Sequence, residues 1–120
     1  HDMPPLRAWW EEDRGTTERF YHEVLGCGGD APAHCETWIL RRIIEMHLAS
    51  PSMFAILPLQ DWLALDERIR RPDPQAERIN VPAIPRYYWR YRMHLTLEQL
   101  LAEEGFNASL HDMIACSGRR

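Results

Sequence analysis

The sequence lacks a long apolar run, a surplus of positive charge and an even set of cysteines. No hydrophobic stretch approaches the roughly 20 residues that cross a bilayer, so we expect no membrane-spanning helix. The polar start of the chain, with its double proline, gives no sign of a secretory leader. The formal net charge is -4, whereas nucleic-acid binders usually carry a basic surplus. We therefore expect neither a membrane nor a nucleic acid as partner.

The cysteines are too few for a disulfide framework and too widely spaced for a zinc site. Cys27, Cys35 and Cys116 form no C-x-x-C pair, and the histidines nearby do not have the spacing of zinc ligands. An odd number of thiols suits a reducing compartment. We expect a cytoplasmic protein without a metal or another cofactor.

The chain of 120 residues suits one domain segment rather than two domains. Its apolar spacing predicts three helices before residue 50. The first begins near Leu6 and stops at Gly15, and the second is capped by Thr16 or Thr17. The third begins after Asp30, with Pro32 in its first turn, and ends before Ser50-Pro51.

One later segment has the pattern of a buried strand. Residues 53–57 form a continuous apolar run without alternation, closed by Pro58, as in a parallel strand with both faces covered. A lone strand cannot satisfy its own backbone hydrogen bonds. We therefore expect its partners outside this chain, in an α/β protein. Because the chain opens at His1 rather than a methionine, we expect it to be a fragment.

The rest of the chain divides into a short helix, a long loop and terminal helices. A helix is predicted over residues 61–65, and a proline-containing loop over 66–95. Terminal helices are expected over 97–117. The first of them has a capping box of Thr96 and Gln99, and Gly105 is expected to end it.

Three short blocks carry a family resemblance. They are His1-Asp2 followed by Leu6-x-x-Trp9-Trp10; Leu57-Pro58-Leu59-Gln60-Asp61-x-Leu63; and Arg78-Ile79-Asn80-x-Pro82 followed by Trp89 and Arg92. In this order, over most of the chain, they resemble the amylomaltase (disproportionating enzyme) family of 4-α-glucanotransferases. Ala8 and Ala83 stand where glycine is common in the family, and Tyr88 and Tyr91 where Asn and Trp are common. The stretch from 80 to 97 looks most like the larger, plant-cytosolic-like branch.

The resemblance implies a fold and an activity. The fold class would be α/β, with residues 1–120 as a single C-terminal segment of a (β/α)8 catalytic barrel, mostly helical here with one buried parallel strand. The implied enzyme transfers α-1,4-glucan segments with retention between maltose, maltodextrin or glycogen-like glucans. Retention needs two carboxyls about 5–5.5 Å apart. The family's nucleophilic Asp and acid/base Glu lie on earlier strands, so we expect residues 1–120 alone to be inactive.

The resemblance also assigns roles to five residues. Asp2 would be the catalytic transition-state stabiliser, and His1, Asn80, Gln60 and Trp89 would bind substrate. The residue types alone leave other roles open. Asp2 can simply cap the first helix, Asp61 can cap the short helix that follows the apolar run, and Asn80 can form a turn.

The aromatic and arginine residues at 87–92 admit an alternative function. Aromatic faces with arginines hold sugar rings, but the same interleaving stacks nucleic-acid bases or packs a loop against its domain. The alternative is a non-enzymatic helical binding module that uses this loop for RNA or a protein partner. The acidic net charge favours the glucan interpretation.

Overall fold

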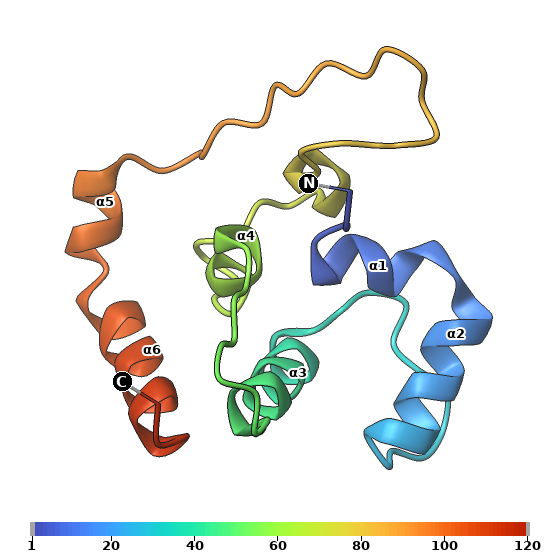
Figure 1. The fold of residues 1–120 in the computed structure, drawn as a ribbon, viewed down its shortest axis with the longest axis horizontal. Helices are drawn as coiled ribbons and strands as arrows, with labels where there is room; N and C mark the ends of the chain where they lie inside the picture. The colour runs from blue at the N-terminus through green and yellow to red at the C-terminus, as the bar shows by residue number, and fades with distance from the viewer. Residues whose placement is uncertain (1, 120) are drawn as a thin grey trace.

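All regular elements of the part that the computed structural model describes, residues 2–119, are helical (Figure 1). In chain order they are α1 (Leu6–Glu12), α2 (Arg14–Arg19), the π-helix η1 (Phe20–Val24), α3 (Thr37–Ala49), α4 (Leu59–Leu63), the 3-10 helix η2 (Pro74–Glu77), α5 (Leu97–Ala102) and α6 (Glu104–Cys116). None of these helices is long and apolar enough to traverse a bilayer.

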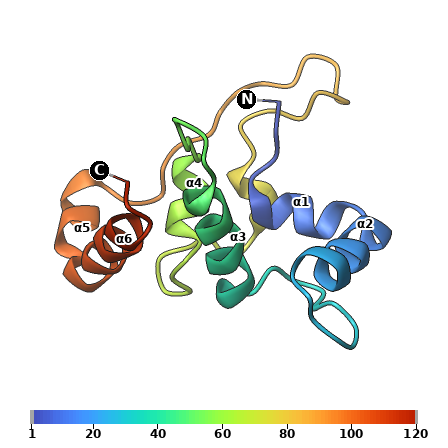
Figure 2. The ribbon, with the colours of Figure 1, turned by 60° about the horizontal axis from the view of Figure 1, so that its bottom comes forward.

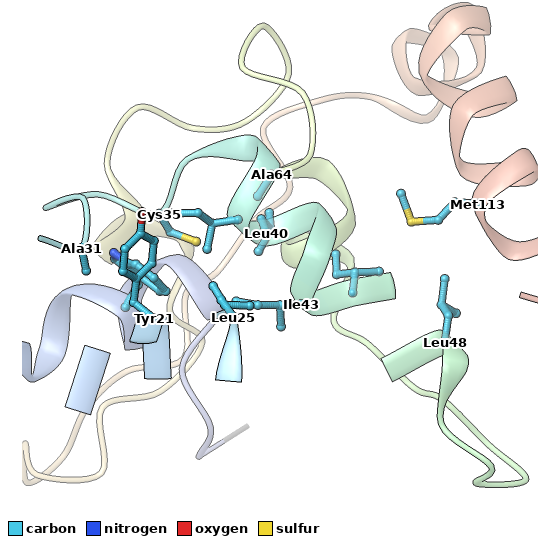
Figure 3. Close-up of a cluster of buried hydrophobic side chains, with 12 residues drawn as sticks. Tyr21, Leu25, Ala31, Cys35, Leu40, Ile43, Leu48, Ala64 and Met113 are labelled. Carbon is cyan, nitrogen blue, oxygen red and sulfur yellow. The ribbon is translucent and has the colours of Figure 1, made fainter. Parts of the chain in front are cut away.

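The helix α3 is the centre of the molecule. It lies between the α1–α2 pair and the α5–α6 pair in both views (Figures 1 and 2). Its buried residues are Ile39, Leu40, Ile43, Ile44 and Leu48, which recur at the spacing of one helical face. Figure 3 shows Tyr21 and Leu25 near one end of this row and Met113 of α6 near Leu48. A smaller core of Leu63, Ile69 and Phe106 links α4 to α6.

The strand predicted over residues 53–57 is absent, so the fold class predicted from the sequence is wrong for the described residues. This segment is an extended connection between α3 and α4, and Met53, Phe54 and Ile56 are 84%, 73% and 89% exposed. A strand requires a neighbour for its backbone N–H and C=O groups, and residues 2–119 contain none. The apolar run therefore remains without a ladder, and only Ala55 and Leu57 pack partly against the core.

The starts of α2 and α3 differ from the predicted ones. Asp13, rather than Thr16 or Thr17, caps α2 by accepting from the backbone N–H of Gly15 at 3.1 Å, so Gly15 lies inside a helix. The helix α3 begins at Thr37 and not after Asp30. The backbone near residue 31 is engaged elsewhere, because the Pro32 carbonyl accepts from Trp10 Nε1 at 2.8 Å.

The end of the chain confirms one predicted signal and corrects another. The capping box of Thr96 and Gln99 is present at the start of α5. Gly105 does not end that helix, since α5 stops at Ala102 and Gly105 lies in the first turn of α6.

After α6, the Arg119 guanidinium donates to the carbonyls of Leu48, Ser50 and Ser52 at 2.7, 2.6 and 2.9 Å. The last residues are thereby tied to the end of α3.

Candidate functional site

Asp2 and Asn80, two predicted site residues from distant parts of the chain, lie in direct contact. Asn80 Nδ2 donates to Asp2 Oδ1 at 2.8 Å across a separation of 78 residues. Asp2 is exposed in the segment before α1, and Asn80 is half-buried in the loop after η2. Asn80, predicted to bind substrate, thus holds the carboxylate of Asp2. His1 lies outside the described residues.

A hollow of about 410 Å³ adjoins this pair. Its lining residues come from three segments: Met3 and Pro5; Ile56, Leu57, Pro58 and Gln60; and Glu77 and Ile79. Met3 and Ile79 directly adjoin Asp2 and Asn80 in the chain. The volume falls in the range of small-molecule sites, and a mainly apolar wall with a few polar groups is typical of them. The hollow is therefore the candidate binding site.

Gln60 belongs to the wall of the hollow, where its amide has a structural partner. The side chain is 4% exposed, and its Nε2 donates to the backbone carbonyl of Glu77 at 3.3 Å. This bond joins α4 to the end of η2. Gln60 therefore holds the segment that carries Asn80.

Asp61 caps a helix, but not the helix expected. Its Oδ1 accepts the backbone N–H of Leu6, the first residue of α1, at 2.8 Å, while its own helix α4 has no side-chain cap. Burial raises the pKa of Asp61 to about 6, and the Leu6 N–H and the charge of His47 oppose that rise. Asp61 thus fixes the start of α1 close to α4.

A buried ion pair, which the sequence analysis missed, lies between α1 and η2. Arg7 is 6% exposed and Glu77 1% exposed, and Arg7 Nη1 lies 3.5 Å from Glu77 Oε2. Arg7 also donates to the carbonyls of Arg71 at 2.7 Å and Pro72 at 3.2 Å. Burial raises the pKa of Glu77 against the effect of Arg7, and it lowers the pKa of Arg7.

One sequence signal for this pair was available. Arg7 precedes Trp10 by three residues, so both lie on one face of α1, and Trp10 is 1% exposed. A charge on a buried helical face requires a partner. The identity of that partner, Glu77, could not be read from the spacing, because the two residues are 70 positions apart in the chain.

Trp89 lies at a different hollow. This hollow, of about 600 Å³, is lined by Trp89, Arg90, Tyr91 and Arg92, and it shares no lining residue with the hollow beside Asp2. Arg90 stacks over the Tyr88 ring at 5.0 Å, a cation–π geometry. The structure therefore brings Asp2, Asn80 and Gln60 to one corner, whereas Trp89 lines another hollow.

Among residues 2–119, no three or more His, Cys, Asp or Glu side chains are grouped so that they could hold a metal ion. Cys27, Cys35 and Cys116 are free thiols. Burial raises the pKa of Cys35 to about 12, so its thiol stays protonated at neutral pH.

A family model and two curated relatives carry the same description. Residues 1–97 match the family described as 4-alpha-glucanotransferase. The chain is 42% identical over 119 residues to 4-alpha-glucanotransferase DPE2 of Oryza sativa subsp. japonica, covering 99% of this chain and 13% of that protein. It is 30% identical over 111 residues to the 4-alpha-glucanotransferase of Chlamydia muridarum, covering 92% and 20%. No solved structure matches the chain. The chain thus spans a small part of these relatives, which give no support to the RNA-binding alternative.

Proposed function

Because the chain belongs to the 4-alpha-glucanotransferase family, we propose that it forms part of an enzyme that transfers α-1,4-glucan segments with retention. The donors and acceptors are maltose, maltodextrin or glycogen-like glucans. The observation that carries the proposal, beyond the family match, is the Asn80–Asp2 hydrogen bond of 2.8 Å beside a hollow of about 410 Å³. The three free thiols suit an enzyme of the cytoplasm.

Asp2 is proposed as the transition-state stabiliser. An ionised carboxylate accepts charge-assisted hydrogen bonds from sugar hydroxyls. Such bonds strengthen as the ring distorts toward an oxocarbenium-like transition state. Asn80 contributes by holding Oδ1 of Asp2, which limits the rotation of the carboxylate. His1, next to Asp2 in the chain, is proposed to bind the same sugar.

The other predicted residues receive more distant roles. Gln60 lines the hollow, and its bond to the Glu77 carbonyl supports the loop that carries Asn80. Trp89 is 59% exposed and offers an aromatic face on which a glucan can stack outside the cleavage point. The nucleophile and the acid/base are proposed to lie outside residues 1–120, which alone would then transfer no glucan.

The experiment compares Asp2→Asn with the unchanged protein in the complete enzyme. Glucose release from maltose should show a kcat lower by about 10²–10³-fold, the usual cost of losing one preorganised group at a transition state. Asp30→Asn is the matched control, because Asp30 is an exposed carboxylate in the connection before α3. A kcat of Asp2→Asn within twofold of the unchanged enzyme would overturn the role of Asp2.

A second measurement addresses the division of the catalytic groups. The purified piece of 120 residues should release no glucose from maltose. Release of glucose by this piece would contradict the proposal that the nucleophile and acid/base lie elsewhere.

A further inference from the structure

The corner that holds Asp2 depends on two segments that are far apart in the chain. Asp2 stands four residues before the start of α1 at Leu6, and Asn80 stands three residues after the end of η2 at Glu77. Neither residue belongs to a helix. Their contact therefore requires that α1 and η2 be held in a fixed relation to each other.

The Arg7–Glu77 pair joins these two elements inside the protein. Arg7 belongs to α1 and Glu77 is the last residue of η2, and their charged atoms lie 3.5 Å apart. The two remaining bonds of Arg7 reach the carbonyls of Arg71 and Pro72, on the approach to η2. The Arg7 guanidinium thus ties α1 both to the last residue of η2 and to the segment that leads into η2.

Short, stiff connections transmit this relation to the site. Met3, Pro4 and Pro5 separate Asp2 from α1. The proline rings fix the backbone φ of two of these three residues, and Pro5 has φ -55° and ψ 151°. On the other side, Arg78 is extended, with φ -67° and ψ 132°. A shift of α1 against η2 would therefore move Asp2 relative to Asn80.

Stability alone does not account for this pair. Glu77 Oε2 is the buried side-chain oxygen or nitrogen that has no hydrogen-bond partner within the described part of the chain. Replacing a buried ion pair by apolar residues of similar volume is often neutral or stabilising. A charged pair with an unsatisfied oxygen is thus a costly way to fill this space, and its geometric effect explains its presence better.

We propose that Arg7 and Glu77 are positioning residues of the glucanotransferase reaction, which lock α1 to η2 so that Asn80 meets Asp2 beside the hollow. This inference rests on the proposed function of Asp2. Arg7 does not line the hollow, and Glu77 borders it with a side chain that is only 2% exposed. Both residues therefore act through the Asn80–Asp2 contact rather than by binding the glucan.

The first test is Glu77→Gln in the complete enzyme, with glucose release from maltose as the readout. The variant keeps the side-chain size and removes the charge that faces Arg7. The kcat should fall about tenfold or more with KM within twofold, since a displacement of about 1 Å at a catalytic group can cost about 10²-fold. Glu12→Gln is the matched control: Glu12 pairs with Arg78 at 3.2 Å and so joins the same elements, but its side chain is 55% exposed. That variant should stay within twofold.

The second test separates positioning from general stability. If Glu77 acts through the Asn80–Asp2 contact, Glu77→Gln should change kcat less than threefold in an enzyme that already carries Asn80→Ala. Each enzyme is assayed well below its own unfolding temperature. Losses in kcat that simply multiply would overturn the inference and leave the role of Asp2 intact. An Asp2→Asn enzyme with unchanged kcat would instead overturn the proposed function, and this inference with it.

If Glu77→Gln fails to fold, a double variant that should fold provides the same test. Arg7→Met with Glu77→Met replaces both charges by apolar side chains of similar length, an exchange that buried ion pairs tolerate. The folded double variant should have a kcat at least tenfold lower with KM nearly unchanged. A folded double variant with the kcat of the unchanged enzyme would overturn the inference.

Discussion

Two parts of this chain use arginine in opposite ways. Arg7 is 6% exposed and is held by Glu77 and by two backbone carbonyls. Arg90 is exposed and stacks on Tyr88, and no ion pair of Arg90 with a carboxylate occurs within residues 2–119. The first arginine joins two elements of the fold, whereas the second lies exposed at the surface. The difference lies in the surroundings, since the side chains are identical.

Replacing each arginine in turn by methionine should give the largest difference in the free energy of unfolding. Arg7→Met should lower the free energy of unfolding by about 3–5 kcal/mol, because it leaves the Glu77 charge buried without a counter-ion. Arg90→Met is the matched control and should change it by about 0.5 kcal/mol or less, as is usual for exposed sites. Chemical denaturation measures both. A loss for Arg7→Met no larger than that for Arg90→Met would contradict the picture of a buried clamp.

The buried carboxylate of Asp61 should make the stability of the folded protein depend on pH, in contrast to an exposed carboxylate. Its pKa is about 6 in the folded protein against an ordinary value of 3.8, so the folded state binds the proton more tightly than the unfolded state. The stability that Asp61 contributes is therefore complete below pH 3.8 and is lost as pH rises through about 6. At about 1.4 kcal/mol per pKa unit, the loss is about 3 kcal/mol.

The measurement for Asp61 is the difference between two stability curves. The free energy of unfolding of the unchanged protein, minus that of Asp61→Asn, should fall by about 2.4 kcal/mol between pH 4 and pH 7, because part of the full effect is already lost at pH 4. The asparagine keeps an oxygen for the Leu6 N–H but cannot titrate, so all other groups cancel. A difference independent of pH would show that burial does not perturb Asp61.

Local sequence signals predicted local structure in part, since the cap of α2 and the end of α5 differ from the predicted ones. The capping box of Thr96 and Gln99 is present because its partners lie within one helical turn. The third helix also ends before Ser50-Pro51, as predicted. The strand over 53–57 failed because a strand depends on neighbours that no pattern within the segment can supply.

The site was predicted only in part, for the same reason. The resemblance named Asp2 and Asn80 separately, and the structure places them 2.8 Å apart. A cap on the helix beside it was one possible role of Asp61, yet Asp61 caps α1 from 55 residues away. The partnership of Arg7 with Glu77 is likewise a product of the chain path. Residue type indicated the chemistry of these groups, whereas long-range packing decided which of them meet.

The smallest predicted effect concerns α5, the helix that follows the exposed loop. None of its residues is buried, and only Leu100 packs partly against the core. The local bond from Gln99 N–H to Thr96 Oγ1, 3.1 Å long, therefore contributes strongly to its order. Thr96→Ala should cost about 1 kcal/mol, which corresponds to about fivefold faster amide hydrogen exchange in α5. The amides of α1, capped from a distance by Asp61, are the internal control and should exchange unchanged. Equal acceleration in both helices would mean that α5 does not open independently of the buried clamp, and that the two regions form one cooperative unit.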